Sequence, residues 1–286
     1  MTLLTLALMA ALFIGLTLGL IGGGGSILTV PVLTYLLGLG AREATAYSLF
    51  IVGMAASVGA YRFWRNGQVD FRQSLWLGIP ALISVYFARA VVVPLIPEVL
   101  WEFESWVLTD DLAFMLVFAI VMVISSVAMI RGRGEQLATG PVHPFGLAFA
   151  GLFIGLLTGM LGAGGGFVII PTLMFVGKLP VKKAMGTSLV IITINSLFGF
   201  LTDILNASNV TYQVDWALLL QFVALALVGI LAGARLNKHV SGGKLKVLFG
   251  WFVLVMGLFI LVERLQDTFS QAPENLELNQ SFLHKK

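Results

Sequence analysis

Apolar and polar residues follow one another along this 286-residue chain in long blocks. Ten apolar segments are separated by polar connections: residues 3–21, 27–37, 44–61, 75–93, 112–130, 145–161, 167–176, 184–205, 216–234 and 247–262. A helix needs about 20 predominantly apolar residues to cross a bilayer, so the segments 27–37 and 167–176 are too short to cross alone. Strands of a membrane barrel would alternate apolar and polar residues, and these segments do not, so the pattern predicts helices.

The two short segments each follow a glycine cluster, and the clusters belong to an internal repeat. Residues 15–49 align without a gap on residues 155–189, and 12 of the 35 positions are identical. Glycines that interrupt apolar helices at two corresponding places are typical of transporters with a substrate site between repeats. We therefore interpret residues 3–37 and 145–176 as two broken, hairpin-like units.

The composition indicates an integral membrane protein. The chain is 58% hydrophobic and 11% charged, with a mean hydropathy of +0.98, which excludes a soluble domain of this length. It contains no cysteine, so disulfides, thiolate metal sites and cysteine nucleophiles are excluded. Residues 1–20 lack a basic start and belong to the repeat, so we expect structure there rather than a cleaved signal.

The charges in the connections predict how the chain is oriented. Residues 93–111 hold five acidic residues and no basic one. Four other connections hold 12 of the 17 Lys and Arg residues: Arg62, Arg65, Arg72, Arg131, Arg133, Lys178, Lys182, Lys183, Arg235, Lys238, Lys244 and Lys246. Basic connections favour the cytoplasmic side. The unit 145–176 then starts and ends inside the cell, and the unit 3–37 starts and ends outside.

These directions predict an all-α polytopic membrane protein with two inverted-topology repeats, each a glycine-broken helical hairpin followed by three transmembrane helices. Residues 1–263 would form a single transmembrane transporter domain, with repeat 1 at 1–130, a linker at 131–144 and repeat 2 at 145–263. Residues 264–286 form a polar tail. We expect a multi-pass protein of the cell inner membrane with both termini outside the cytoplasm. The repeat alone would also suit a parallel duplication, so the prediction depends on the charges.

The glycine clusters are candidates for binding an anion. Glycine lets the backbone turn at positive φ, and a helix that restarts after a break leaves free N–H groups that attract anions. Ser26 is expected to cap the half-helix that begins near Ile27. Unwound carbonyls could instead bind a cation, and close helix packing is the alternative for the small residues. Packing is the favoured interpretation for Gly15, Gly19, Gly155 and Gly159.

Polar residues that follow the half-helices complete the candidate site, because hydroxyl and amide groups can replace the hydration shell of a substrate. The same side chains can instead bond back to their own helix. The candidate substrate-binding residues are Gly22, Gly23, Gly24, Gly25, Ser26, Ser48, Gly162, Gly164, Gly165, Gly166, Ser188 and Asn195. Repeat 2 has Ala163 and Gly166 where repeat 1 has Gly23 and Ser26, so the two halves of the site differ.

Two ionisable residues near the ends of apolar segments are candidates for gating or charge roles. Arg89 could attract an anion, or it could extend to the membrane interface, which is the favoured interpretation. Asp203 could carry a proton, but an acid at the membrane interface is the favoured interpretation. Neither residue belongs to an enzyme motif.

No catalytic pattern is present, so we expect no enzyme, no metal and no cofactor. The sequence contains neither HExxH nor GxSxG, and His143, His239 and His284 lie in connections or the tail. The glycine run lacks the lysine of a nucleotide-binding loop. Nucleic acid is not expected as a partner, because most basic residues flank apolar segments.

In the two glycine segments and the residues that follow them, the chain resembles the TauE/SafE family of sulfite and organosulfonate exporters. The likeness includes residues 19–31 and 159–171, the segments 44–49 and 184–189, and the related motifs Gly67-Gln-Val-Asp70 and Gln213-Val-Asp215. The resemblance implies a permease of the bacterial inner membrane that moves small anions, often sulfur oxyanions. Export is implied by the resemblance alone.

The expected function is secondary transport of a small anion, most simply sulfite or an organosulfonate, by alternating access, with the site between the two glycine-rich broken helices. The expected partners are that anion and the lipid bilayer. A passive anion channel is the alternative, because it would share the glycine-lined constriction. A membrane enzyme or a structural subunit fits less well.

Overall fold

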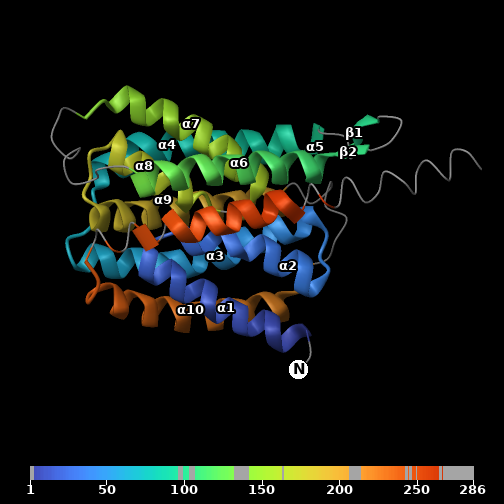
Figure 1. Ribbon diagram of the computed structural model, residues 1–286, viewed down its shortest axis with the longest axis horizontal. Helices are drawn as coiled ribbons and strands as arrows, with labels where there is room; N and C mark the ends of the chain where they lie inside the picture. Colours follow the sequence, from blue (N-terminus) through green and yellow to red (C-terminus); the bar gives the residue numbers. More distant parts are fainter. Residues whose placement is uncertain are drawn as a thin grey trace, which may run out of the picture.

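The computed structural model describes residues 3–95, 99–102, 107–131, 142–162, 164–205, 214–241, 244, 247–248, 250–263 and 266. Its first half contains α1 (Leu3–Ile21), the 3₁₀ turn η1 (Gly24–Leu28), α2 (Thr29–Leu37), α3 (Ala41–Arg65), α4 (Phe71–Phe87), the π-helical turn η2 (Ala88–Val92), α5 (Val93–Leu95), β1 (Val99–Glu102), β2 (Val107–Thr109) and α6 (Asp110–Arg131). Its second half contains α7 (Pro144–Leu161), α8 (Gly166–Phe175), α9 (Val181–Leu205), α10 (Trp216–Asn237) and a further apolar helix, Gly250–Glu263. Figure 1 shows the helices side by side.

The predicted all-α polytopic fold is confirmed. Among the described residues, six helices are long and apolar enough to cross a membrane: α1, α7, α9 and α10, residues 43–65 of α3, and residues 71–92, which join α4 to η2. The structure adds a short antiparallel pair, β1 and β2, within the acidic connection. Most of the predicted linker and tail lie outside the described residues.

Both long apolar hairpins break at their glycines because the backbone turns there at positive φ. Gly22 and Gly23 end α1, with φ of 74° and 116°. Gly162, Gly164 and Gly165 separate α7 from α8, with φ of 66°, 65° and 69°. Residues with a Cβ rarely adopt these angles, so each cluster determines where its helix stops. The short helices α2 and α8 then run back beside α1 and α7.

Corresponding helices of the two halves make reciprocal contacts. The helix α1 packs along α10, α7 packs along α4, and α3 packs against α9. Gly15 faces the backbone of Ala226, and Gly155 faces the backbone of Ala81. One turn further along, Gly19 faces the backbone of Ile230, and Gly159 faces Ala88 and Val85. These contacts confirm the packing interpretation for the four glycines, since small residues let helices approach closely in lipid.

Two aspartates of the related motifs, Asp70 and Asp215, start α4 and α10 in the same way. Each Oδ1 accepts the N–H three residues ahead at 3.0 Å, which satisfies an open donor of the first turn. Each backbone N–H donates to a hydroxyl of the other half, from Asp70 to Thr187 Oγ1 at 2.9 Å and from Asp215 to Tyr47 Oη at 2.6 Å. Thr187 is the repeat equivalent of Tyr47, so the N-caps also join the halves.

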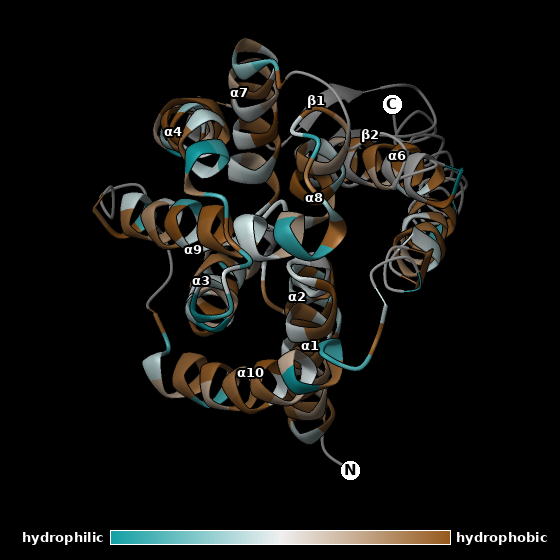
Figure 2. Ribbon diagram, turned by 90° about the vertical axis from the view of Figure 1, so that its left-hand side faces the viewer, coloured by the Kyte–Doolittle hydropathy of each residue, from teal (hydrophilic) through white to brown (hydrophobic). Residues whose placement is uncertain are grey.

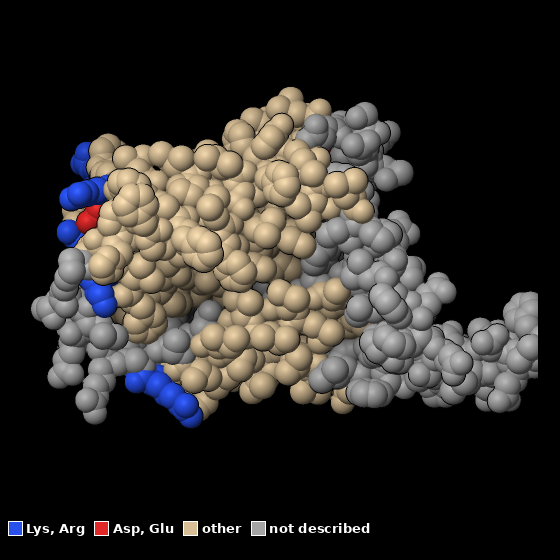
Figure 3. Space-filling view, turned by 90° about the horizontal axis from the view of Figure 1, so that it is seen from above, with Lys and Arg blue, Asp and Glu red and all other residues tan. Residues whose placement is uncertain are grey.

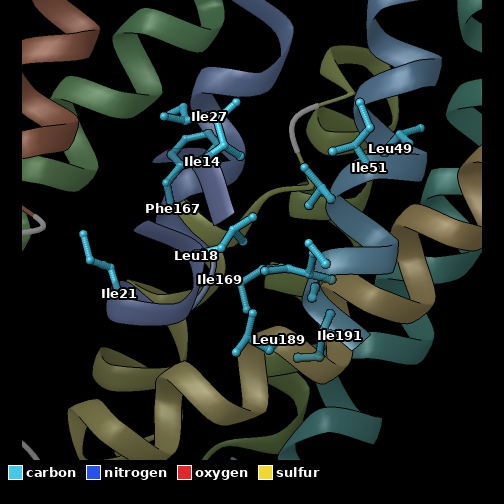
Figure 4. Packing of buried hydrophobic residues seen from close by; sticks show 14 of the residues in the cluster. Ile14, Leu18, Ile21, Ile27, Leu49, Ile51, Phe167, Ile169, Leu189 and Ile191 are labelled. Atoms are coloured by element: carbon cyan, nitrogen blue, oxygen red, sulfur yellow. The ribbon is translucent and has the colours of Figure 1, made fainter. Parts of the chain in front are cut away.

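The core lies around the two hairpins, and the outer helix faces are apolar too. Figure 4 shows Ile14, Leu18 and Ile27 of the first hairpin near Phe167 and Ile169 of the second, all nearly or fully buried. Large apolar side chains such as Phe149, which is 76% exposed, cover the outside. Figure 2, an end-on view, shows the predominantly hydrophobic helices. A helix that is apolar on all sides suits a bilayer.

The hairpins open toward opposite ends of the molecule. In Figure 1 the free ends of α1 and α2 lie at the end where the N-terminus is marked, and those of α7 and α8 lie at the other. Figure 3 shows Lys and Arg gathered at that second end, which we call the basic end. These directions favour the predicted inverted repeats. Orientation in a membrane stays a prediction.

Candidate functional site

The two glycine clusters meet inside the molecule. We call residues 22–25 the first glycine turn and residues 162–166 the second, of which residue 163 is not described. A Cβ on Gly166 would contact the carbonyl oxygen of Gly23 and lie 2.5 Å from its carbonyl carbon. A Cβ on Gly23 would lie 3.1 Å from the Cα of Gly166. The backbones cross here because neither residue has a side chain.

The helices α3 and α9 flank this crossing through equivalent positions. Met185 of α9 contacts Gly22, and its equivalent Thr45 of α3 contacts Gly162. Both helices also reach Gly164, at 2.9 Å from Val52 and 3.3 Å from Ile192 to the position of an added Cβ. Residues spaced by three, four and seven share a face of a helix. One face of α9 therefore contacts both glycine turns, and one face of α3 contacts the second.

The faces of α3 and α9 that lie toward the glycine turns differ in polarity about one turn further along each helix. α9 carries Asn195 and Ser196 where α3 has Ala55 and Ala56. The Asn195 side chain and the Ser196 hydroxyl are buried, and neither Asn195 Oδ1, Asn195 Nδ2 nor Ser196 Oγ has a hydrogen-bond partner in the described part of the chain. Ser196 Oγ lies 3.4 Å from the Cβ position of Gly164. Such a group costs about 1–3 kcal/mol when it stays unpaired, so a ligand that bonds to it gains accordingly.

The hydroxyl of Ser48 is also buried and without a partner among the described residues. Its equivalent in the second half, Ser188, instead has two acceptors for its single hydroxyl proton, Gly22 O at 2.6 Å and Met185 O at 2.8 Å. Ser188 therefore holds the first glycine turn, while Ser48 is open to a ligand. Ser48, Asn195 and Ser196 are the polar residues that the site leaves open.

Ser26 does not cap a helix, so that prediction is wrong. It lies within η1, and α2 begins three residues later, at Thr29, after the N-cap Leu28. The hydroxyl of Ser26 donates to Gly23 O at 2.8 Å, because the 3₁₀ turn brings that carbonyl within reach. Ser26 thus fixes the shape of the first glycine turn in this conformation.

The remaining candidate glycines divide by what they contact. Gly25 faces Thr17 and Ile14 of α1, and Gly165 faces Thr158 and Ile154 of α7, so both pack within their own hairpins. Gly24 starts η1. The glycines that contact the other half are Gly22, Gly23, Gly162, Gly164 and Gly166.

Arg89 and Asp203 form a buried ion pair. Arg89 Nη1 lies 2.9 Å from Asp203 Oδ2, and the two side chains are 3% and 13% exposed. The same nitrogen lies 3.4 Å from Thr45 Oγ1. The favoured interpretation of Arg89 as a residue that extends to the interface is therefore wrong, because its charge is neutralised inside the protein.

Sequence reasoning missed Ser196 and the Arg89–Asp203 pair. Ser196 follows Ser188 by eight positions, so helical spacing places both on one side of α9. The ion pair joins residues 114 positions apart, which no local pattern indicates. In the described part of the chain, no group of three or more His, Cys, Asp or Glu residues could hold a metal ion.

Apolar helices long enough to span a membrane, with two broken hairpins that meet inside the molecule, are typical of membrane transport proteins. The chain belongs to the sulfite exporter TauE/SafE family, whose sequence model matches residues 7–260. It is 28% identical over 270 residues to a probable membrane transporter protein of Methanocaldococcus jannaschii, with 91% of this chain and 96% of the relative covered. It is also 28% identical to one of Xylella fastidiosa (87% and 91% covered) and 24% identical to one of Bacillus subtilis (90% and 99% covered).

Proposed function

We propose that this protein is a secondary transporter that exports a small anion, sulfite or an organosulfonate, from the cytoplasm across the cell inner membrane. The observation that carries the proposal is the set of buried, unpaired polar atoms of Ser48, Asn195 and Ser196 on the helices that flank the glycine turns. The family supplies the substrate class.

Backbone groups add to the attraction for an anion. The helix α8 begins at Gly166 with Gly165 as its N-cap, and η1 begins after the N-cap Gly23. A glycine N-cap has no side chain to accept a first-turn N–H, so helix starts of this kind are available to an anion. The N–H groups at the starts of η1 and α8, which come from opposite halves and meet where the glycine turns cross, would bind an oxyanion without a metal ion.

The packing suggests which parts move. The closest helix pairs, α1 with α10 and α4 with α7, each join one helix from each half. Rocking would therefore separate the α1–α10 pair from the α4–α7 pair, with α3 and α9 between them. The Gly23–Gly166 crossing is the natural pivot, and the site would open to each side in turn.

Flux into reconstituted vesicles tests the proposal. Vesicles that contain the protein should accumulate labelled sulfite, sulfoacetate or thiosulfate faster than protein-free vesicles, with saturation as the anion concentration rises. Repeating the assay with and without a pH gradient shows whether protons are coupled to transport. Absence of flux for all three anions would contradict the substrate class, and large unitary currents in bilayer recordings would establish a passive anion channel instead.

A further inference from the structure

The most unusual charged group of the described chain is Arg89, a buried arginine that uses only one of its three nitrogens. Nη1 contacts Asp203 and Thr45. Nε and Nη2 are buried and have no hydrogen-bond partner within the residues that the structure describes. Nε–H and one Nη2–H point in the same direction, so together they form the edge with which arginine binds two oxygens of one anion.

This open edge belongs to a side chain close to the second glycine turn. Arg89 in η2, Asp203 in α9 and Thr45 in α3 come from three separate elements. The side chain of Thr45 contacts Gly162, so the arginine is one residue away from the second glycine turn. Asp203 lies two residues before the end of α9, toward the end of the molecule opposite the basic end (Figure 1).

A structural ion pair alone would not leave the edge open. Burying a charge is costly unless its hydrogen-bonding groups are satisfied, and the two unused donors add to that cost. Charged groups at membrane depth are rare and generally mark functional sites. Arg89 also lies in the π-helical turn η2, and turns of this kind recur at functional sites.

We propose that Arg89 is the oxyanion-binding residue of the transport path and that Asp203 is its resident counter-ion. The inference rests on the proposed function and assigns the ligand class: an anion with two oxygens on one central atom, as in sulfite, sulfonates or carboxylates. The Nε–Nη2 edge binds both oxygens, while Asp203 keeps the arginine oriented and limits how tightly the anion is held. Release then stays possible, because the carboxylate repels the bound anion.

Binding of sulfite and sulfoacetate to purified protein, measured by titration calorimetry in a maltoside detergent without phospholipid, tests this assignment. Arg89→Lys keeps the charge but loses the two-pronged edge, so affinity should fall about tenfold. Asp203→Asn removes the repelling carboxylate, so affinity should rise at least about tenfold. A purely structural pair predicts no such rise.

Controls separate folding from binding. The double variant Arg89→Gln/Asp203→Asn leaves no uncompensated charge, so it should fold, and it should bind both anions more weakly than Arg89→Lys does. Arg65→Gln removes the same charge from the exposed end of α3 and should leave affinity unchanged.

Three outcomes would contradict the proposals. If the wild-type protein transports the anions but both single variants have unchanged dissociation constants, only this inference is overturned. A wild-type protein that neither binds nor transports these anions would overturn the proposed function as well. Loss of sulfite binding on addition of phosphatidylglycerol would assign the edge to a lipid phosphate and also overturn the inference.

Discussion

At the scale of a single residue, substitution of Asn195 should change stability and transport in opposite directions. Its side chain is 4% exposed, and both of its polar atoms are without a partner in the described chain. Asn195→Leu replaces the amide by an apolar group of similar size, which removes an unsatisfied buried group. Thermal stability should therefore stay equal or rise, by up to about 2 kcal/mol. Flux of the true substrate should fall at least about tenfold, since an amide contact is lost.

The matched control for Asn195 is Ile194, its exposed neighbour on the outer side of α9. Ile194→Leu changes a lipid-facing position and should alter neither stability nor flux. Normal transport by Asn195→Leu would show that the amide of Asn195 is not part of the substrate site.

Gly166 tests the crossing of the two turns. Its φ is not positive, so Ala is tolerated by the backbone, and α-helical propensity would even favour it by about 1 kcal/mol. The added methyl group would instead press on the carbonyl of Gly23. Gly166→Ala should therefore insert and fold but lose most of its flux. Gly40→Ala, at a position with no neighbour within 4 Å, should transport like the wild type.

Individual polar residues were the hardest to predict from the sequence. The repeat identified Ser48 and Ser188 as a pair, but their hydroxyls have different environments, because only Ser188 reaches a carbonyl of the first glycine turn. Ser26 differed between the halves and therefore stood out, yet its hydroxyl is already bonded to Gly23. Hydrogen-bond satisfaction depends on atoms brought together by folding, and sequence spacing does not contain that information.

At the scale of the elements, the N-caps of α4 and α10 contribute to stability through local bonds. Replacing Asp70 by Ala removes an acceptor from the first turn of α4 and should cost about 0.5–2 kcal/mol. Asp70→Asn keeps an acceptor and should cost less. Urea or thermal unfolding in detergent measures both. A drop in flux that is larger than the loss of folded protein would show that the cap acts in transport instead.

The elements themselves follow closely from the hydrophobic pattern. The segment predicted at residues 3–21 coincides with α1, and the segment 184–205 lies within α9. Helix ends at glycine were predictable because positive φ requires that residue type. Helix ends at charged residues were less predictable. The helix α3 extends three residues earlier and four residues later than its apolar segment, because Glu43, Arg62 and Arg65 interrupt the apolar pattern without ending the helix.

At the scale of the whole molecule, the repeat equivalence of Arg65 and Leu205 tests the inverted topology. Both residues are exposed, and each ends its helix, α3 or α9. Arg65 belongs to a basic connection and Leu205 to the opposite end, so a two-fold relation predicts opposite sides of the membrane. The chain has no cysteine, which makes a single introduced thiol unambiguous.

In intact cells, an impermeant thiol reagent should label Leu205→Cys and should label Arg65→Cys only after the membrane is permeabilised. Lys183→Cys, about 33 Å from Leu205 along α9 at 1.5 Å per residue, is the internal control and should behave like Arg65→Cys. Labelling of Arg65→Cys and Leu205→Cys from the same side would mean a parallel duplication. The starts of η1 and α8 at the glycine crossing would then face the same side of the membrane. Alternating access in which the two repeats exchange their conformations would lose its structural basis, because that exchange requires inverted repeats.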